Sequence, residues 1–212
     1  MRLVLDWDGT VTERDTLDLV LEEFGDAEVY ERAEVELEAG RMTLNEVIAA
    51  EFATVTAPLE EVVAHVVEHA RVRPGFAELA RSWHPLVVSS GFRELIEPVL
   101  EREDVLGEVE LRANSVETRP DGWRVDFRVS QMCAECGEAC KRRDVEELKR
   151  VDRSCGDLPA REVVYAGDGH SDHCVSLAAD RVFATDGLAS WLDEQGVPYR
   201  PLTDFHALAA EL

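Results

Sequence analysis

Two aspartates stand two residues apart in the run Asp6-Trp7-Asp8-Gly9-Thr10. Side chains at positions i and i+2 of an extended segment project to the same side. Two carboxylates can therefore meet at one reacting centre and still keep different protonation states in different surroundings. Such a pair is typical of a catalytic site. We favour this interpretation over a surface turn, in which Asp and Gly are also common.

Two later segments carry groups for the same chemistry. Ser89-Ser90-Gly91 follows an apolar run and opens a helical pattern. Its hydroxyl and N–H groups can hold a phosphate at a helix N-terminus, although an ordinary helix cap is an equally good interpretation. Asp168 and Asp172 follow another apolar run and, with the first aspartate, offer the carboxylate oxygens that Mg²⁺ prefers. A turn with a helix cap at Asp172 is the alternative there.

Lys141 is a further candidate, because lysine is rare in this chain. The sequence has 20 Arg but only 2 Lys, so its composition strongly favours arginine. A lysine beside Arg142 and Arg143 therefore suggests a site that needs a compact ammonium group. On counts alone, a solvated surface lysine is the simpler interpretation.

The elements that position these residues form an α/β pattern. Four continuously apolar runs each end in a carboxylate or hydroxyl residue, at positions 3–5, 86–88, 163–166 and 182–184. Such runs predict strands covered on both faces, and helical patterns follow at 75–83, 92–101, 142–152 and 171–179. The sequence thus predicts a doubly wound parallel sheet, a Rossmann-like core that binds ligands beyond the carboxyl ends of its strands.

The segment after the first strand is helical in pattern. Its apolar stripes end at Gly25 and Gly40, and Thr43 with Glu46 forms a capping box for a further helix. We predict a helical cap, residues 14–72, inserted into a core of residues 1–13 and 73–212. Residues 108–129 alternate around the turn at 120–122, which predicts a β-hairpin.

The composition limits the partners. The net charge is 22 − 45 = −23, and a surface this acidic repels nucleic acid and anionic lipid. No apolar run approaches the ~18 residues that a membrane span needs, and the N-terminus shows no signal peptide. We therefore predict a cytoplasmic protein without nucleic-acid or membrane partners, of unknown oligomeric state. Any site for an anionic substrate needs local positive charge from a metal and basic side chains.

Taken together, these motifs resemble a known family. Asp6-Trp7-Asp8-Gly9-Thr10, Ser89, Lys141 and Asp168 with Asp172 occur in the order of the four motifs of the haloacid dehalogenase superfamily. The helical insertion resembles the small cap of its phosphoserine-phosphatase-like branch. Segments 136–141 and 182–188 resemble methionine-salvage phosphatases acting on 2-hydroxy-3-keto-5-methylthiopentenyl 1-phosphate. Segment 167–174 is closer to phosphocholine and phosphoethanolamine phosphatases, which leaves the substrate open.

The resemblance implies a Mg²⁺-dependent phosphatase of a small phosphorylated metabolite. Asp6 is then the nucleophile that forms an aspartyl-phosphate, and Asp8 is the general acid and base. Lys141 offsets the charge of Asp6 and of the phosphate. The implied metal residues, one of them through its carbonyl, are Asp6, Asp8, Asp168 and Asp172. The implied phosphate-binding residues are Thr10, Ser89 and Ser90.

Three cysteines at short spacing suggest a second metal. Cys133, Cys136 and Cys140 could bind a structural Zn²⁺, with a fourth ligand from Cys155, Cys174 or a histidine. The alternative is that they only shape a loop. No signal peptide precedes them, which favours a reducing compartment and free thiols.

Substrate contacts from the cap are harder to assign. Glu13, Asp15 and Arg41 are the polar residues best placed by sequence to face the active site. Two other functions stay open: a phosphotransferase that passes the same intermediate to an alcohol, and a catalytically silent metal-binding or regulatory module. Retention of both carboxylates beside a metal site argues against the silent module.

Overall fold

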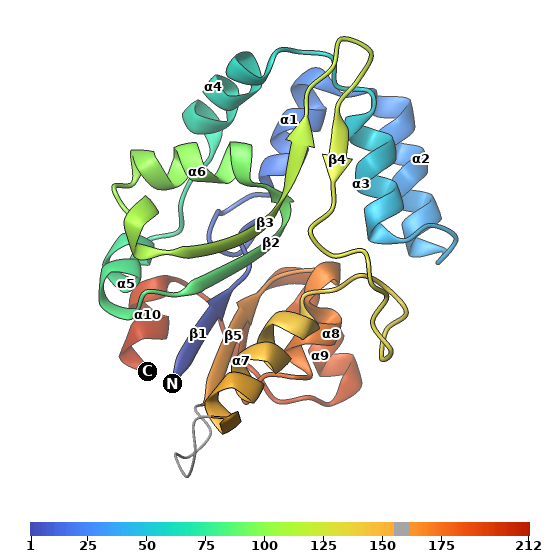
Figure 1. Ribbon diagram of the computed structural model, residues 1–212. Coiled ribbons are helices and arrows are strands. Elements are labelled where there is room, and N and C mark those ends of the chain that lie inside the picture. The colour runs from blue at the N-terminus through green and yellow to red at the C-terminus, as the bar shows by residue number, and fades with distance from the viewer. Residues whose placement is uncertain (155–161) are drawn as a thin grey trace.

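The computed structural model describes residues 1–154 and 162–212. The described part contains a seven-stranded sheet in the order β4-β3-β2-β1-β5-β6-β7 (Figure 1). All neighbouring strands are parallel except β3 and β4. The predicted doubly wound α/β core is therefore confirmed. The strands are β1 (Arg2–Leu5), β2 (Leu86–Phe92), β3 (Glu110–Glu117), β4 (Arg124–Asp126), β5 (Val163–Gly167), β6 (Arg181–Ala184) and β7 (Arg200–Pro201).

Helices cover both faces of the sheet, which explains why its central strands are continuously apolar. Leu5 packs in one cluster with Phe205, and Val4 packs in another with Val145. Alternate residues of β1 thus bury themselves on opposite faces. Helices α5 (Phe76–Trp83) and α10 (Phe205–Ala210) cover the first face. The other face is covered by α7 (Arg142–Ser154), α8 (His173–Ser176) and α9 (Asp186–Gln195).

The strand order places the candidate residues at one edge. Strand β1 lies between β2 and β5, and Leu5 is opposite Val87 on one side and Ala166 on the other. The chain therefore leaves β1 in one direction and returns on its other side, which is the topological switch point where such sheets bind ligands. Asp6, Ser89 and Asp168 all lie at this end of the strands.

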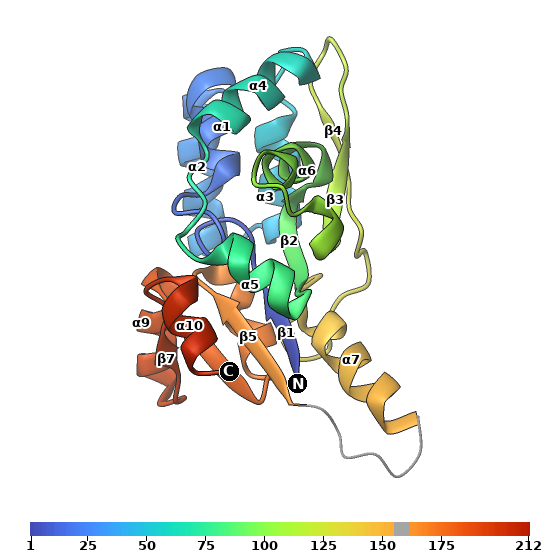
Figure 2. The same ribbon diagram turned by 90° about the vertical axis from the view of Figure 1, so that its left-hand side faces the viewer.

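Four helices form the layer above that edge (Figure 2). They are α1 (Thr16–Phe24), α2 (Ala27–Glu38), α3 (Leu44–Phe52) and α4 (Leu59–His69). We propose that residues 14–72 form the cap and that residues 1–13 with 73–212 form the core, as the sequence predicts. Two backbone hydrogen bonds support this division, because they pair the chain where it enters and leaves the cap: Glu13 N–H to the Arg71 carbonyl and Arg73 N–H to the Val11 carbonyl, both at 2.8 Å.

The predicted β-hairpin has a further strand partner that the alternating pattern did not indicate. Strands β3 and β4 pair antiparallel as expected, with Val116 opposite Val125. The first half of β3, however, also pairs parallel with β2, so the hairpin extends the central sheet. At its turn, Trp123 donates from its backbone to the Val55 carbonyl at 3.0 Å and from its indole to the Ala57 carbonyl at 3.0 Å. The hairpin thus joins the core sheet to the cap.

Two element boundaries differ from the sequence prediction. Strand β2 continues through the predicted helix-opening segment to Phe92, because β3 still pairs with it there across a register shift. Helix α6 (Arg93–Arg102) begins only after that point. The helix predicted at 171–179 is a short 3₁₀ turn (His170–Asp172) followed by α8. A second 3₁₀ turn (Leu106–Glu108) precedes β3. Among the described residues, no helix is long and apolar enough to span a membrane.

Candidate active site

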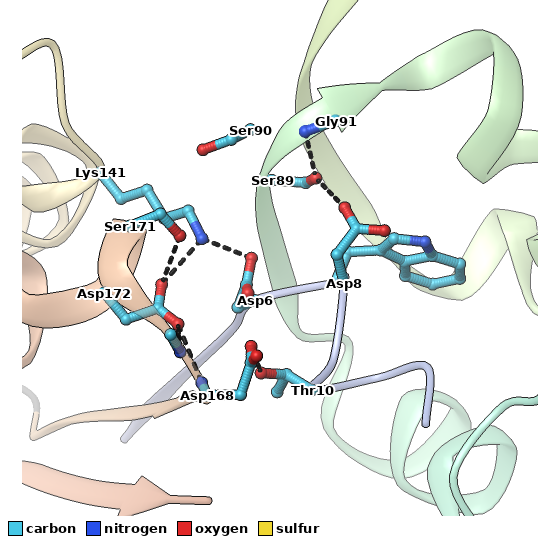
Figure 3. Close-up of polar contacts among 12 residues, drawn as sticks. Asp6, Asp8, Thr10, Ser89, Ser90, Gly91, Lys141, Asp168, Ser171 and Asp172 are labelled. Atoms are coloured by element: carbon cyan, nitrogen blue, oxygen red, sulfur yellow. Dashed lines mark hydrogen bonds and ion pairs between the residues drawn. The ribbon is translucent and has the colours of Figure 1, made fainter. Parts of the chain in front are cut away.

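Asp6 follows β1 directly and lies in the middle of the site (Figure 3). Its backbone N–H continues the sheet by donating to the Ala166 carbonyl at 2.9 Å. The residue is only 4% exposed, and its carboxylate forms an ion pair with Lys141. Burial raises the pKa of Asp6 well above its usual value, and the charge of Asp172 raises it further, whereas Lys141 acts in the opposite direction.

Asp8 has an entirely different set of partners. Its Oδ1 accepts hydrogen bonds from the Thr16 hydroxyl and, at 2.9 Å, from the Thr16 backbone N–H. Its Oδ2 accepts from the Ser89 hydroxyl at 3.2 Å. Burial raises the pKa of Asp8, while the Thr16 hydrogen bonds, the charge of Lys141 and the Ser89 hydrogen bond lower it. Asp6 and Asp8 therefore lie in different surroundings, as the sequence predicts.

Asp172 is fully buried and orders the groups around it. Its Oδ1 accepts from the Tyr165 hydroxyl at 2.6 Å, from Lys141 at 2.8 Å and from the Ser171 hydroxyl at 3.2 Å. Its Oδ2 accepts from the Asp168 backbone N–H at 2.9 Å. Burial alone would raise the pKa of Asp172, but the charge of Lys141 and the hydrogen bonds from Lys141, Tyr165 and the Asp168 N–H hold it below its usual value.

Lys141 immediately precedes α7 and is 4% exposed, so it is not a solvated surface lysine. Its ammonium group lies between the carboxylates of Asp6 and Asp172 (Figure 3). Burial by itself would lower the pKa of Lys141, but the charges of Asp172 and Asp6 raise it above its usual value. The side chain therefore stays a cation at the centre of the site.

The carboxylates fit a divalent cation. One oxygen each from Asp6, Asp168 and Asp172 lies within 4.8 Å of the others. One ammonium group, paired with Asp6 and Asp172, accompanies these three carboxylates, which leaves excess negative charge in a largely buried space. Burial and the charge of Asp172 raise the pKa of Asp168 to about 6. Hard oxygen donors with excess negative charge are the ligands that Mg²⁺ takes.

The three predicted phosphate-binding residues have different positions. Ser89 is buried, and its hydroxyl accepts from the Gly91 N–H at 2.8 Å while it donates to Asp8. Ser90 lines the cavity above the aspartates. The Thr10 hydroxyl instead donates to Asp168 at 2.9 Å, so it orients a metal-site carboxylate. Because the hydroxyl hydrogen of Thr10 is already donated to Asp168, we infer that Thr10 orients this carboxylate and does not bind phosphate.

A cavity of about 240 Å³ opens between the cap and this edge of the sheet. Its floor includes Asp6, Asp8 and Asp168. Apolar side chains from the cap form part of its wall, namely Leu17, Leu21, Leu37, Leu44, Val47 and Ile48. Polar cap residues complete the wall, namely Asp15, Asp18, Tyr30, Glu34 and Glu51. The space suits the organic part of a small molecule whose reacting group sits on the aspartates.

Of the cap residues suggested by sequence, only Asp15 lines this cavity. Glu13 is exposed at the start of the cap, where only its backbone is engaged, with the Arg71 carbonyl. Arg41 is exposed after α2 and forms an ion pair with Glu36 at 2.6 Å. The structure does not bring Glu13 or Arg41 to the cavity, because Glu13 lies where the chain enters the cap and Arg41 pairs with the preceding helix, α2.

The cysteines gather beside the site. Atoms Sγ of Cys133, Cys136, Cys140 and Cys174 all lie within 4.8 Å of one another. Cys174, one of the proposed fourth ligands, is therefore the described cysteine that joins the other three. Cys155 lies outside the described residues.

Several residues that matter to the geometry carried no sequence signal. Tyr165 lies inside an apolar strand pattern, so its hydroxyl gave no sign of its bond to Asp172. Thr16 is the first residue of α1, and its contact with Asp8 depends on how the cap is placed. Arg73 donates to the Gly9 carbonyl at 2.8 Å and to the Thr10 carbonyl at 3.0 Å, which fixes the turn after the aspartates. Nothing distinguished it among 20 arginines.

Two buried aspartates with different partners, a cation and a carboxylate cluster that fits a divalent metal together suit transfer of a phosphoryl group. Comparison with known proteins agrees. A sequence profile of the haloacid dehalogenase-like hydrolases matches residues 3–176. The chain belongs to this family. The expected family, the fold class and the class of enzyme are thereby confirmed, since the relatives are named as phosphatases.

Curated relatives of this hydrolase match over nearly all of its length. One is the 2-hydroxy-3-keto-5-methylthiopentenyl-1-phosphate phosphatase of Exiguobacterium sibiricum, 24% identical over 100% of this chain and 96% of the relative. The protein of the same name from Brevibacillus brevis is 26% identical over 96% of this chain and 91% of its own. At this identity, the names describe those proteins and leave the substrate of this chain open.

Solved structures show the same fold. A phosphoserine phosphatase with substrate bound has a TM-score of 0.71 at 18% identity, covering 100% of this chain and 98% of its own. A phosphoserine phosphatase with a phospho-aspartyl intermediate analogue has a TM-score of 0.69 at 18% identity, covering 99% and 96%. The similarity extends over the cap as well as the core.

Proposed function

We propose that this hydrolase is a Mg²⁺-dependent phosphomonoesterase that acts on a small phosphorylated metabolite in the cytoplasm. The observation that supports this most is the contrast between its two leading aspartates. Asp6 forms an ion pair with Lys141, which also pairs with Asp172. Asp8 instead accepts hydrogen bonds from the hydroxyl groups of Thr16 and Ser89. One carboxylate is thereby suited to attack phosphorus and the other to move a proton.

In the first step, a carboxylate oxygen of Asp6 attacks phosphorus and the bond to the ester oxygen breaks. Asp8 gives its proton to the departing oxygen, so an alcohol leaves and an aspartyl-phosphate remains. In the second step, Asp8 takes a proton from water, the water oxygen bonds to phosphorus, and the carboxylate of Asp6 is released. Lys141 forms an ion pair with Asp6 and so favours the ionised nucleophile, whereas Asp8 is bonded to the neutral groups of Thr16 and Ser89 and can carry the proton needed at the start.

Positive charge balances the transferred group. Lys141 is held by Asp6 and Asp172 within reach of both the nucleophile and a bound phosphate. Mg²⁺ bound to the carboxylate cluster would neutralise further negative charge on the phosphoryl group. In a chain with a net charge of −23, this local compensation is what allows an anionic ester to bind.

The cap couples substrate closure to acid catalysis. Thr16, the first residue of α1, holds Asp8 through both its hydroxyl and its backbone N–H. A shift of α1 would therefore change the orientation and the proton affinity of Asp8. Closure of the cap over the substrate also excludes water from the phosphoryl group during the first step.

Hydrolysis of p-nitrophenyl phosphate tests this function. We expect activity that requires Mg²⁺ and stops in EDTA, and an Asp6→Asn variant that loses at least ~10³-fold in kcat. Asp121→Asn, at the exposed turn of the hairpin, is the matched control and should keep full activity. Equal activity in EDTA, or an active Asp6→Asn enzyme, would show the proposal to be wrong. Added small alcohols should stay unphosphorylated if water is the acceptor, and their phosphorylation would indicate a phosphotransferase.

A further inference from the structure

Four free thiols meet at a junction between two distant segments. Cys133, Cys136 and Cys140 belong to the loop that leads from β4 to α7, and Cys174 belongs to α8. Their Sγ atoms lie within 4.8 Å of one another, and those of Cys133 and Cys174 are 3.9 Å apart. A disulfide requires about 2.05 Å between sulfurs, so these thiols are near neighbours but not bonded.

The spacing fits tetrahedral coordination. Zinc binds thiolates at about 2.3 Å, which places sulfurs on a tetrahedron about 3.8 Å apart. The measured 3.9 Å between Cys133 and Cys174 is close to that edge. Four sulfur ligands also leave no open position, which is typical of a structural rather than a catalytic zinc.

The loop itself has the form of a metal-binding turn. The Gly137 N–H donates to the Cys133 carbonyl at 2.9 Å, and the Cys133 N–H donates to the Glu138 carbonyl at 2.8 Å. Gly137 has a φ of +76°, a conformation that glycine adopts without strain. The turn folds the chain back so that its thiols face one point. Most side chains of this loop are exposed, so it has little apolar packing to hold it.

We propose that the four thiolates bind one structural Zn²⁺ and that this ion fastens the loop before Lys141 to helix α8. Cys140 is the residue before Lys141, and Cys174 is two residues after Asp172. The ion therefore ties together the two segments whose ends carry the central ion pair of the active site. Lys141 depends on the zinc for its position, which makes the cysteines positioning residues.

Metal content tests the site itself. Protein produced in zinc-supplemented medium, without a metal-affinity step, should contain near one equivalent of zinc by elemental analysis. A mercurial reagent should release that zinc, and Co²⁺ in its place should give the absorption of tetrahedral thiolate coordination. Cys174→Ser and Cys136→Ser should lose the metal, whereas Cys155→Ser, the matched control, should keep it.

Several results would overturn the assignment. These are wild-type protein with less than a tenth of an equivalent of zinc, a Cys174→Ser variant that keeps its zinc, or iron in place of zinc. The Co²⁺ spectrum and the mercurial titration use the wild-type protein, so they decide the question even if a variant fails to fold.

The link to Lys141 has its own test. In the wild-type background, Cys174→Ser should lower kcat about tenfold or more at saturating Mg²⁺. In a Lys141→Ala background, the same change should have almost no further effect, because both act through one ammonium group. If Cys174→Ser lowered kcat by the same factor in both backgrounds, the cysteines would not act through Lys141. That result would contradict the positioning role but not the zinc site.

A second observation, in the cap cavity, concerns the substrate. The described residues that line this cavity include no lysine or arginine, yet four carboxylates face it from the cap: Asp15, Asp18, Glu34 and Glu51. Glu51 is 5% exposed, and its Oε1 is buried without a hydrogen-bond partner. Asp15 accepts from the Leu17 N–H at 2.7 Å, and Asp18 accepts from the Tyr30 hydroxyl at 3.1 Å.

A buried, unpartnered carboxylate is costly unless a cation or a donor meets it. Among the described residues, none is hydrogen-bonded to Oε1 of Glu51, so the missing partner fits a ligand. The apolar neighbours in the cavity wall, such as Val47 and Ile48, favour a cation that carries hydrocarbon over a fully hydrated ion. An ammonium group on a short carbon chain meets both conditions.

Resting on the phosphatase function proposed above, we infer that the preferred substrate is a phosphate monoester whose organic part bears an ammonium group. Its phosphate would lie on Asp6 and its ammonium group would face Glu51. A substrate tail with a carboxylate would instead meet like charge.

A pair of isosteric esters tests this inference: 3-aminopropyl phosphate and butyl phosphate. We expect kcat/KM to be at least ~10²-fold higher for the amine, in line with the penalty for leaving a buried polar group without a partner. Glu51→Gln should reduce that ratio at least tenfold, whereas Glu60→Gln, on the exposed side of α4, should preserve it.

The outcomes separate this inference from the proposed function. An enzyme that hydrolyses p-nitrophenyl phosphate but treats the two esters alike would contradict the ammonium site alone. An enzyme that hydrolyses no phosphate ester would contradict the phosphatase function. An unchanged ratio in Glu51→Gln would remove Glu51 from the proposed site.

Discussion

A single ammonium group, that of Lys141, lies between two buried carboxylates, and the space between them sets what can replace it. Arginine is planar and wider, and its forked donors do not match one shared point between Asp6 and Asp172. We therefore expect Lys141→Arg and Lys141→Ala each to lower kcat/KM by ~10²-fold or more, about 2.7 kcal/mol of transition-state stabilisation. Steady-state kinetics on both variants measures this.

Arg142 provides the comparison for that prediction. Its side chain pairs with Glu146 at 2.8 Å on the surface of α7, so Arg142→Ala should change the kinetics little. If Arg142→Ala lost most of its activity while Lys141→Ala kept it, the catalytic cation would be Arg142 and our assignment to Lys141 would be wrong.

Glu51 should affect the pH dependence of the free energy of unfolding as well as substrate specificity. Burial, together with the charges of Glu34 and Asp18, raises the pKa of Glu51 from 4.5 to about 8. The folded state then holds this proton more tightly than the unfolded chain does. Its contribution to stability is therefore greatest below pH 4.5 and is lost as the pH rises toward 8.

Glu51→Gln removes that dependence. Without ligand, the free energy of unfolding of the variant should exceed that of the wild type by ~1–2 kcal/mol at about pH 8, and the difference should shrink toward pH 5. Urea titrations at several pH values measure it. A difference that stays constant across this range would mean that Glu51 has an ordinary pKa.

At the scale of elements, the hairpin shows what sequence patterns could and could not predict. Alternating residues and a Pro-Asp-Gly turn were enough to predict β3 and β4. They gave no sign that β3 also pairs with β2, because strand partners are chosen by tertiary packing. The same limit applies to Ser89, whose strand continues to Phe92 only because β3 lies beside it.

Trp123 makes the connection between hairpin and cap testable. It is 1% exposed, packs near Phe52 and donates to the Ala57 carbonyl. Trp123→Ala should lower the free energy of unfolding by ~3–5 kcal/mol, and Trp123→Phe should lose less because much of the ring volume remains. Denaturant unfolding measures both. Losses below 1 kcal/mol for Trp123→Ala would mean that the hairpin does not brace the cap.

The same limit separates the site residues that could be predicted from sequence from those that could not. Asp6, Asp8, Asp168 and Asp172 could be brought together from sequence, because strand ends in a doubly wound sheet converge at one edge. Lys141 precedes a helix instead, and only the rarity of lysine and the family resemblance pointed to it. Glu13 and Arg41 could not be placed correctly, since the orientation of a cap residue depends on how helices pack. Tyr165, Thr16 and Glu51 were missed for the same reason: their importance lies in contacts that cross from one element to another.

For the whole molecule, the dominant feature is the net charge of −23. Mutual repulsion among carboxylates destabilises the compact state, and salt shortens the range of that repulsion. Raising KCl from about 0.1 M to about 2 M should therefore raise Tm by ~5 °C or more. Thermal unfolding followed by circular dichroism measures this. A Tm that is unchanged or lower in high salt would show that the surface charges are already balanced.

The most direct test of the catalytic account is a rapid-quench experiment on Asp8→Asn. This variant keeps the nucleophile but lacks the base that activates water, so the phosphorylated enzyme should accumulate. With excess p-nitrophenyl phosphate and Mg²⁺, we expect a burst of nitrophenol equal to the enzyme concentration. After acid quench, peptide mass spectrometry should find a matching amount of phosphoryl group on Asp6. Two results would contradict the account. One is release of free phosphate in step with nitrophenol from the first turnover, with no phosphoryl group on the protein. The other is a phosphoryl group on a residue other than Asp6.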